Sequence, residues 1–272
     1  MEQFNKYFEA NRDLWNQRTV IHKDSSFYDV EGFKKGRNLL TPIELNELGD
    51  VSGKKLLHLQ CHFGVDSLCW ARMGAEVTGI DLSEVAIDEA RKLNQQLGLN
   101  AQFICSNIYD LKNVLSEKFD IVFTSYGVIG WLPDLDKWAD IISHFLKPGG
   151  TFYLAEFHPV IWMFDDDFTT IKYCYEKRDV IETEIQGTYT DRNAKIRAKE
   201  YAWNHSISEV VNALITHGMQ IQSLNEYMYS PYPCFNNVVT NNDGKWWIKG
   251  LEDKIPMVYS VKAILKIEGA RN

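Results

Sequence analysis

The segment from Leu56 to Asp81, LLHLQCHFGVDSLCWARMGAEVTGID, is the part of the chain that most constrains its fold. It reads as an apolar strand, a tight turn, a helix that ends at Gly74, and a second apolar strand that ends at a carboxylate. Uniformly apolar strands that alternate with helices are typical of parallel sheets covered on both faces. The segment therefore predicts a β–α–β unit of a doubly wound sheet.

The alternation continues to Phe157. Ser83 is placed to cap the next helix, and Pro148-Gly149-Gly150 is expected to end a later one. Because each helix returns the chain to the start of a parallel strand, these segments extend one sheet. The further strands are expected over residues 101–108, 119–127 and 151–157.

The flanking regions follow other patterns. Thr41, Pro42 and Glu44 have the spacing of a helix N-cap, a first helical position and a capping box. Residues 25–36 and 229–256 read as loops, whereas residues 219–228 and 258–267 read as strands. A helix is expected after Ser206 or Ser208. In between, alternating polar and apolar residues predict two or three antiparallel strands with a turn at Thr190–Asn193.

These patterns predict one α/β domain over residues 1–272. Its parts are a helical N-terminal cap (1–50), a ligand-binding core (51–159), a β-rich insertion or lid after the fifth strand (160–205), and a C-terminal helix with the final strands (206–272).

Charge and composition exclude several classes of function. The chain has 272 residues and a net charge of −8, so it lacks the basic excess of a broad nucleic-acid surface. No apolar run approaches the roughly 20 residues that span a membrane, and the polar, aromatic N-terminal stretch does not resemble a signal peptide. The five cysteines are scattered, without a C-x-x-C pair. We therefore expect a cytoplasmic protein without a membrane or nucleic-acid partner.

The turn after the first strand indicates the kind of ligand. Gln60, His62 and Gly64 occupy positions where a dinucleotide-binding turn has three glycines. Those glycines let the backbone approach a pyrophosphate, so a ligand without phosphate does not need them. Asp81 ends the second strand, where a carboxylate meets ribose hydroxyls. The combination favours a nucleoside with an amino-acid tail.

Several motifs, taken in order, resemble one family. They are LLHLQCHFGVD, GIDLS, CSNIYDL, FDIVFTSYGVIGWL and ISHFLKPGGTFYLAEFHP. In this order they are similar to the motifs of the class I S-adenosylmethionine-dependent methyltransferases, most of all in the LKPGG segment. The resemblance implies a Rossmann-like, seven-stranded and mostly parallel sheet whose last strand, within 258–267, is reversed. It also implies S-adenosylmethionine as cofactor and a place in a bacterial small-molecule branch.

The resemblance assigns cofactor contacts to residues at the ends of the strands. His58 stands where the family has an acid, so we expect backbone carbonyls and Gln60 to hold the cofactor's amino group. Asn107 replaces a common aspartate near the adenine, and its side-chain oxygen can still accept a hydrogen bond. The expected cofactor-binding residues are Tyr28, Gln60, Cys61, His62, Gly64, Asp81, Leu82, Asn107, Ile108 and Ser125.

The expected reaction is methyl transfer to an oxygen or nitrogen of a small molecule. Such a reaction depends mainly on holding the nucleophile in line with the methyl group, and a base is needed only for some acceptors. Tyr126 and His158 follow the fourth and fifth strands and are the catalytic candidates, although His158 also fits a hydrogen-bonded loop histidine. No metal is expected, because the acidic run Asp165–Asp167 reads as a solvated turn.

Two other functions remain open at this level. A nicotinamide-dependent dehydrogenase could use a doubly wound sheet, but the missing glycines and the LKPGG segment argue against it. A non-catalytic protein could bind S-adenosylmethionine or S-adenosylhomocysteine, because methyl transfer needs no diagnostic residue. The sequence allows a monomer or a homodimer.

Overall fold

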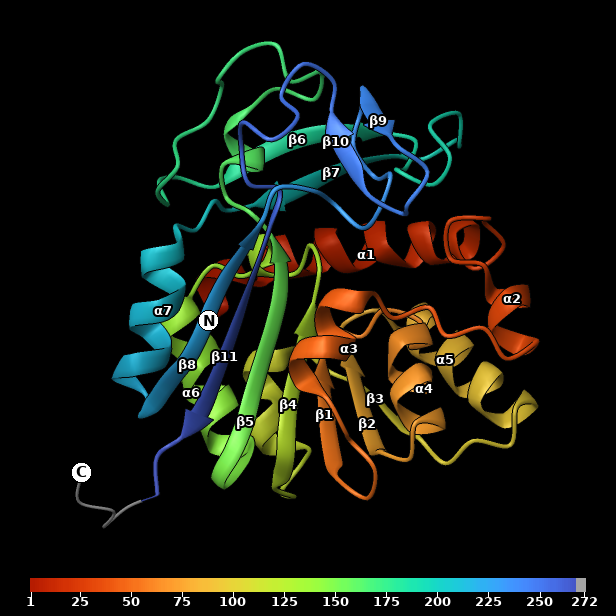
Figure 1. The fold of residues 1–272 in the computed structure, drawn as a ribbon, viewed down its shortest axis with the longest axis vertical. Coiled ribbons are helices and arrows are strands. Elements are labelled where there is room, and N and C mark those ends of the chain that lie inside the picture. The colour runs from red at the N-terminus through yellow and green to blue at the C-terminus, as the bar shows by residue number, and fades with distance from the viewer. Residues whose placement is uncertain (268–272) are drawn as a thin grey trace.

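A seven-stranded sheet forms the centre of the computed structural model, which describes residues 1–267 (Figure 1). The strand order is β3-β2-β1-β4-β5-β11-β8. The strands are β1 (Lys55–Leu59), β2 (Glu76–Asp81), β3 (Gln102–Cys105), β4 (Phe119–Ser125), β5 (Leu146–Phe157), β8 (Met219–Tyr227) and β11 (Val258–Leu265). The predicted α/β sheet is therefore confirmed, and the last residues of the predicted C-terminal part, 268–272, lie outside the described residues.

The helices alternate with these strands. They are α1 (Asn5–His22), α2 (Val30–Lys34), α3 (Pro42–Leu48), α4 (Val65–Arg72), α5 (Glu84–Gln96), α6 (Leu135–Phe145) and α7 (Ile207–Thr216), with short 3₁₀ segments η1 (Glu2–Phe4), η2 (Ile108–Asn113), η3 (Ile129–Trp131) and η4 (Ile161–Met163). The predicted caps are present: Ser83 accepts from the Ala86 N–H, and Ser206 accepts from the Glu209 N–H. Thr41 and Glu44 form the expected capping box of α3.

The direction of the strands agrees with the expectation. β1 pairs in parallel with β2 and β4, and β5 pairs in parallel with β4. β11 runs antiparallel to both β5 and β8, with Val258 opposite Phe157 and Tyr227. The carboxyl ends of the parallel strands consequently meet at one edge of the sheet.

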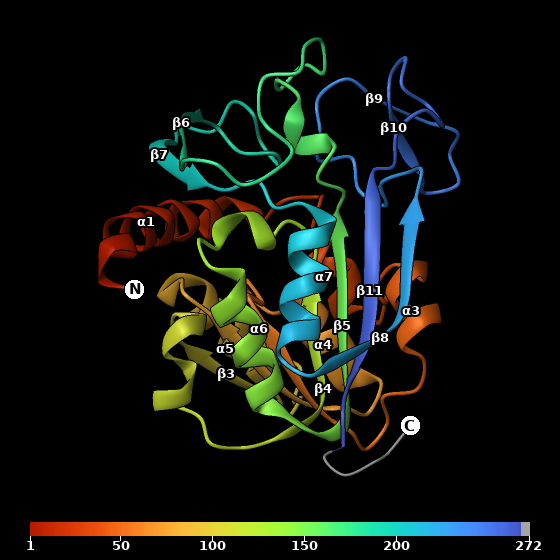
Figure 2. The same cartoon turned by 90° about the vertical axis from the view of Figure 1, so that its left-hand side faces the viewer.

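Alternate residues of each strand pack on opposite faces of the sheet. Leu57 and Val122 join the core beneath α6 and α7, whereas Leu56 and Phe123 join the core beneath α3, α4 and α5. Figure 2 shows helices on both sides of the sheet viewed along its edge. A three-layer sandwich follows from strands that are apolar on both faces.

Local structure differs from the prediction in three places. The 25–36 loop contains the short helix α2, capped by the Asp29 side chain on the Gly32 N–H. The 229–256 loop contains a hairpin of β9 (Val238–Thr240) and β10 (Trp246–Ile248), which alternating apolar residues around a Gly-containing turn support. Pro148-Gly149-Gly150 lies inside β5, because a register shift between Phe119 and Ile121 keeps the strands paired around it.

The insertion forms an antiparallel pair over α1. β6 (Ile181–Gln186) pairs with β7 (Arg197–Ala202), and the predicted turn at Thr190–Asn193 lies in their connection. Figures 1 and 2 show α1 lying between this pair and the carboxyl edge of the sheet. Among residues 1–267, no helix combines the length and the apolar character needed to cross a membrane.

Candidate active site

A cavity of about 840 Å³ lies at the carboxyl edge of the sheet. The ends of β1, β2 and β4 contribute to it, together with α1, the loop after β8 and the insertion. All ten residues expected to bind a cofactor line this cavity, and so does Tyr126: they are Tyr28, Gln60, Cys61, His62, Gly64, Asp81, Leu82, Asn107, Ile108, Ser125 and Tyr126. Residues expected from four separate motifs are thus brought to one place.

The turn between β1 and α4 keeps the backbone of a glycine-rich turn without its glycines. Gln60, His62 and Gly64 have φ values of 57°, 52° and 77°, all in the left-handed region. A non-glycine residue in this region carries strain of about 1–3 kcal/mol. Such strain is maintained where the surrounding structure requires it, and here it directs two polar side chains into the cavity.

Asp81 is held by backbone groups of both adjoining turns. Its Oδ2 accepts from the His62 N–H at 2.7 Å, and its Oδ1 accepts from the Ser83 N–H at 2.9 Å. Burial raises the pKa of Asp81 to about 6, while the backbone hydrogen bonds act in the opposite direction. Each oxygen retains acceptor capacity for a ligand hydroxyl.

Three buried polar atoms on the cavity wall have no hydrogen-bond partner within the described residues. They are Arg18 Nε, Gln60 Oε1 and His62 Nδ1. A buried polar group without a partner costs about 1–3 kcal/mol, so such groups are normally paired. A ligand with a carboxylate, an ammonium group and ribose hydroxyls would supply partners for these atoms and for Asp81. The residues present therefore fit a nucleoside that carries an amino-acid tail.

Asn107 is placed as expected but is partly occupied. Its side-chain oxygen accepts from the Tyr109 N–H at 3.1 Å and caps η2. The amide oxygen has a second lone pair, so an adenine amino group could still be bound there. Ile108 lies beside it, buried in the core below η2.

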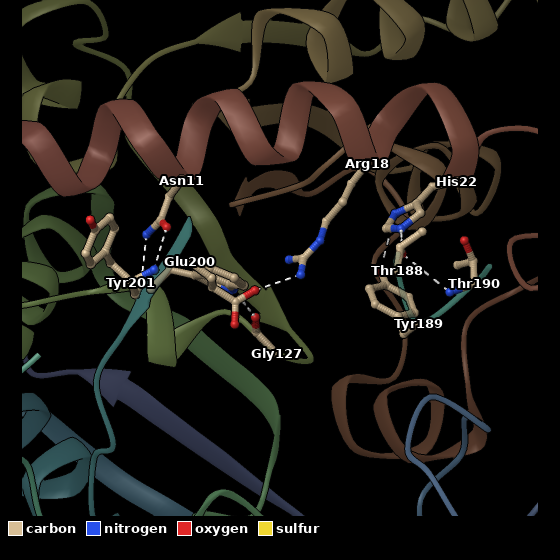
Figure 3. A network of polar contacts seen from close by, with 10 residues as sticks. Asn11, Arg18, His22, Gly127, Thr188, Tyr189, Thr190, Glu200 and Tyr201 are labelled. Carbon is tan, nitrogen blue, oxygen red and sulfur yellow. Dashed lines mark hydrogen bonds and ion pairs between the residues drawn. The ribbon is translucent and has the colours of Figure 1, made fainter. Parts of the chain in front are cut away.

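Helix α1, which lines the cavity, makes polar contacts with the insertion (Figure 3). Asn11 Nδ2 donates to the Tyr201 carbonyl at 2.8 Å, and Arg18 Nη2 donates to Glu200 Oε2 at 2.7 Å. At the end of α1, His22 Nε2 lies 2.5 Å from Thr188 Oγ1. These contacts join segments more than 160 residues apart and hold the β6–β7 pair over the cavity.

Arg18 is the central cation of this wall. Its guanidinium lies 5.0 Å from the ring centroid of Trp15 and 5.7 Å from that of Trp131. The pair with Glu200 is largely buried, since the Arg18 side chain is 8% exposed. Sequence reasoning missed Arg18, although its spacing of four residues from Leu14 and His22 places it on the buried face of α1.

His58 also lines the cavity, but both of its ring nitrogens contact neighbouring serine hydroxyls. Its Nδ1 lies 2.8 Å from Ser67 Oγ, and its Nε2 lies 3.5 Å from Ser125 Oγ. Burial lowers the pKa of His58 to about 3, so the ring is neutral at physiological pH. His58 therefore joins β1, α4 and β4 as a hydrogen-bonded core residue.

Asp66 supplies a carboxylate close to where the acid is missing. It lines the cavity and accepts from Ser125 Oγ at 3.3 Å. Burial raises the pKa of Asp66 to about 6. The sequence carried one signal for it, because it is an acid among the buried apolar residues of α4.

Tyr126 and His158, the two catalytic candidates, have different surroundings. Tyr126 lines the cavity, and its hydroxyl donates to the buried Glu44 at 3.0 Å. His158 is not among the cavity-lining residues. Its Nε2 lies 2.9 Å from Glu226 Oε1, and its Nδ1 accepts from the Val160 N–H at 3.2 Å. The structure thus brings Tyr126 to the cavity and leaves His158 in contacts that anchor the start of the insertion.

The acidic run Asp165–Asp167 lies in a turn in which Asp166 and Asp167 are exposed, and Asp165 and Asp166 also line the cavity. Asp165 accepts from the N–H and hydroxyl groups of Thr169 and Thr170. Among residues 1–267, His, Cys, Asp and Glu side chains form no group of three that could hold a metal ion.

Comparison with known proteins identifies the family. A family model described as a methyltransferase domain matches residues 50–228, which is more than half of the chain. The chain belongs to the class I S-adenosylmethionine-dependent methyltransferase family. S-adenosylmethionine is accordingly its cofactor, as the resemblance implied. The resemblance inferred from the sequence motifs is confirmed.

Curated relatives match part of the methyltransferase. The ubiquinone biosynthesis O-methyltransferase of Proteus mirabilis is 27% identical over 135 residues, which cover 48% of this chain and 55% of that protein. The protein of the same name from Coxiella burnetii is 27% identical over 157 residues, or 57% of this chain and 61% of that protein. The chain therefore spans between about half and two thirds of the length of these relatives.

Solved structures share the fold of the methyltransferase. An S-adenosylmethionine-dependent methyltransferase from Mesorhizobium loti has a TM-score of 0.57 at 20% identity, with 85% of this chain and 99% of that chain covered. A geranyl diphosphate C-methyltransferase from Streptomyces coelicolor, solved with S-adenosyl-L-homocysteine, has a TM-score of 0.55 at 15% identity, with 82% and 74% covered. At these identities the likeness establishes the fold alone.

Proposed function

We propose that this methyltransferase transfers the methyl group of S-adenosylmethionine to an oxygen or nitrogen of a small molecule. The observation that carries the proposal is the single cavity in which the cofactor turn, Asp81 and an aromatic wall meet beneath the insertion. A cavity of about 840 Å³ suits a small acceptor rather than a polymer. The curated relatives, named as O-methyltransferases of ubiquinone biosynthesis, support oxygen as the acceptor atom.

We assign the two ends of the cofactor from the charges and unpaired atoms of the cavity. Asp81 would accept from the ribose hydroxyls, and Asn107 with Ile108 would meet the adenine. Gln60 Oε1 and Asp66 are acceptors suited to the ammonium group, whereas Arg18 is a donor suited to the carboxylate. When bound, the cofactor supplies an activated methyl group on a sulfonium.

The chain's own contribution is to position the acceptor and exclude water. Helix α1 and the β6–β7 pair border the cavity, and the contacts of Arg18 and His22 hold α1 and the insertion together. Holding reacting atoms in a near-attack arrangement supplies a large part of the rate enhancement in such reactions. Tyr126 lies on the wall beyond the cofactor residues, where it can meet the acceptor.

Calorimetric titration with S-adenosylmethionine, followed by a methyl-transfer screen over small hydroxyl and amine compounds, tests the proposal. We expect binding of the cofactor and release of S-adenosylhomocysteine with at least one acceptor. Binding without turnover on any acceptor would favour a non-catalytic binding protein. Absence of binding to a folded, cofactor-free preparation would refute the proposal.

The assignment of Arg18 leads to a prediction for cofactor affinity. Replacing Arg18 with methionine keeps much of the apolar packing but removes the cation, and a charge-assisted hydrogen bond contributes about 1.5–3 kcal/mol. We expect S-adenosylmethionine to bind at least about tenfold more weakly, as measured by calorimetry. Glu200→Gln is the matched control, because it breaks the same ion pair but leaves the guanidinium. Equal weakening in both variants would assign the effect to closure of the lid instead.

Asp66 leads to a prediction for stability. Its folded-state pKa of about 6 exceeds the ordinary value of 3.8, so the ionised carboxylate destabilises the fold above pH 6 and has no effect below about pH 4. We expect Asp66→Asn to raise the free energy of unfolding of the cofactor-free protein by about 1–2 kcal/mol at pH 7.5, after allowing for water in the cavity. Urea unfolding at pH 7.5 and 4.5 measures this gain. A gain of the same size at both pH values would contradict the explanation.

A further inference from the structure

The wall around Tyr126 is aromatic. The Tyr126 ring lies 5.1 Å from the ring of Tyr232, nearly perpendicular to it, and 5.7 Å from the ring of Phe157. Phe157 in turn lies 4.9 Å from Phe235. All four rings line the cavity. Aromatic side chains arranged in this way offer faces and edges on which a planar ring can stack.

Behind Tyr126 lies a fully buried carboxylate. Glu44 is 0% exposed, and its Oε2 accepts from the Tyr126 hydroxyl at 3.0 Å. The Thr41 N–H donates to Glu44 Oε1 at 2.6 Å, and the Thr41 hydroxyl donates to Oε2. A capping-box glutamate needs only to reach the N-cap backbone N–H, but this one also accepts from a cavity-lining phenol. Glu44 thus makes a contact that capping the helix does not require.

This arrangement connects the cavity to a proton acceptor. Burial raises the pKa of Tyr126 well above its usual value, so its phenol stays protonated and donates to Glu44. The oxygen of that phenol keeps a lone pair that can accept a hydrogen bond from a hydroxyl in the cavity. A proton can therefore pass from an acceptor to Tyr126 while the Tyr126 proton passes to Glu44.

We propose that the methyl acceptor is a planar phenolic compound whose hydroxyl proton leaves through Tyr126 to Glu44. This inference rests on the proposed function and narrows its substrate class. The O–H bond of the acceptor breaks, and its oxygen bonds to the methyl carbon. The electron pair of the broken carbon–sulfur bond stays on sulfur, and the net proton resides on Glu44. Charge and atoms balance without a further reactant.

The strength of the base selects among acceptors. Burial, opposed by the hydrogen bonds from Thr41, raises the pKa of Glu44 to about 7. Proton transfer to Glu44 from a phenol with an ordinary pKa near 10 is unfavourable by a factor of about a thousand, which a reaction can tolerate. For an aliphatic hydroxyl, whose pKa resembles the value of about 15.7 for water, the same proton transfer is unfavourable by a factor of about 10⁹. A neutral amine attacks through its lone pair and needs no base beforehand.

Burial is the main cause of the raised pKa of Glu44, and the nearby Asp66 raises it further. Asp66 of α4 is an acid, and the remaining titratable neighbours that interact with Glu44 are phenols. These phenols are Tyr126, Tyr153, Tyr229 and Tyr232. Because none of these neighbours carries a positive charge, they do not favour the ionised form of Glu44.

The same helix offers a matched control. Glu47 lies one turn after Glu44 and accepts from the Tyr153 hydroxyl at 2.9 Å and from the Tyr227 hydroxyl. Neither Glu47 nor these tyrosines line the cavity. Glu44→Gln and Glu47→Gln therefore make the same chemical change on the same helix, and only the first interrupts a path to the cavity.

The experiment compares methyl transfer to mono- and dihydroxybenzenes, matched benzyl alcohols and matched anilines. We expect the phenols to be methylated best. Glu44→Gln and Tyr126→Phe should each lower kcat by about a hundredfold with little change in KM. The rise of kcat/KM with pH through about 7 should be lost in Glu44→Gln. Glu47→Gln should keep the rate and the pH profile.

Binding of S-adenosylmethionine, measured by calorimetry on each variant, separates the possible failures. If wild type does not bind it, the proposed function fails. If cofactor binds but anilines or benzyl alcohols outperform phenols, or no probe is methylated, the phenolic assignment is overturned. If phenols are methylated but Glu44→Gln behaves like Glu47→Gln, the proton path is overturned. Intact cofactor binding in Glu44→Gln excludes misfolding as the cause of its loss.

Discussion

Replacing Gly64 with alanine is expected to lower the free energy of unfolding by about 2–5 kcal/mol. Gly64 has a φ of 77°, which an alanine adopts only with strain. An added Cβ would also lie 2.6 Å from the Phe103 ring and 2.9 Å from the Ala90 Cβ. Both neighbours belong to the packed core beneath α5, so neither can withdraw freely. Urea unfolding followed by circular dichroism measures the loss.

Gly98→Ala is the matched control for this prediction. Gly98 has a φ of 61°, but no atom lies within 4 Å of a Cβ placed there. Gly98→Ala should lower the free energy of unfolding only through the backbone strain, by about 1 kcal/mol. If Gly64→Ala lowers the free energy of unfolding by no more than Gly98→Ala does, contact with Phe103 does not restrict the turn. Gly64 would then be required by its conformation alone.

Replacing Asp81 with alanine is expected to weaken binding of S-adenosylmethionine roughly ten- to more than a hundredfold. Charge-assisted hydrogen bonds to the ribose contribute about 1.5–3 kcal/mol. The change also removes the acceptor for the His62 and Ser83 N–H groups, which keeps the turn in shape. Calorimetric titration measures the affinity, and thermal unfolding of the cofactor-free variant checks that the fold survives.

The pH dependence of binding provides an independent check on Asp81. Its pKa of about 6 means that the carboxylate is ionised at pH 7.5 and largely protonated at pH 5. A protonated acid is a weaker acceptor, so wild-type affinity should fall as the pH falls through 6. Asp81→Asn should lose affinity at pH 7.5 and lack the Asp81-dependent part of this decline. An unchanged affinity in Asp81→Ala would place the ribose elsewhere.

Sequence patterns predicted much of the fold because they are local. The apolar strands and the caps at Thr41, Ser83 and Ser206 depend on residues a few positions apart, and the structure has them as expected. The order of the motifs predicted the sheet topology and the cofactor through the resemblance to the family. The sequence did not predict the short elements α2, β9 and β10. Helix α2 has five residues, and β9 and β10 have three residues each, which is too short for a clear hydrophobic periodicity.

The sequence placed the ten expected cofactor residues and Tyr126 at the cavity, but it did not indicate Arg18 or Asp66. Asp81 and the turn were recognisable because each follows a strand whose end must lie at the carboxyl edge. His158 also follows a strand, yet its ring contacts Glu226 and does not line the cavity. A strand end therefore locates a residue along the edge but does not determine which way its side chain turns.

The sequence by itself determined the doubly wound sheet, the position of the carboxylate Asp81 at the end of the second strand and the ligand class, because strand periodicity and turn spacing act over short distances. The tertiary structure alone decided that Arg18 meets Glu200, 182 residues away, and that Tyr126 meets Glu44, 82 residues away. It also decided that Gln60 and His62 adopt a backbone suited to glycine. Such features depend on packing between distant segments, and no spacing within the sequence specifies which distant partner a side chain will meet.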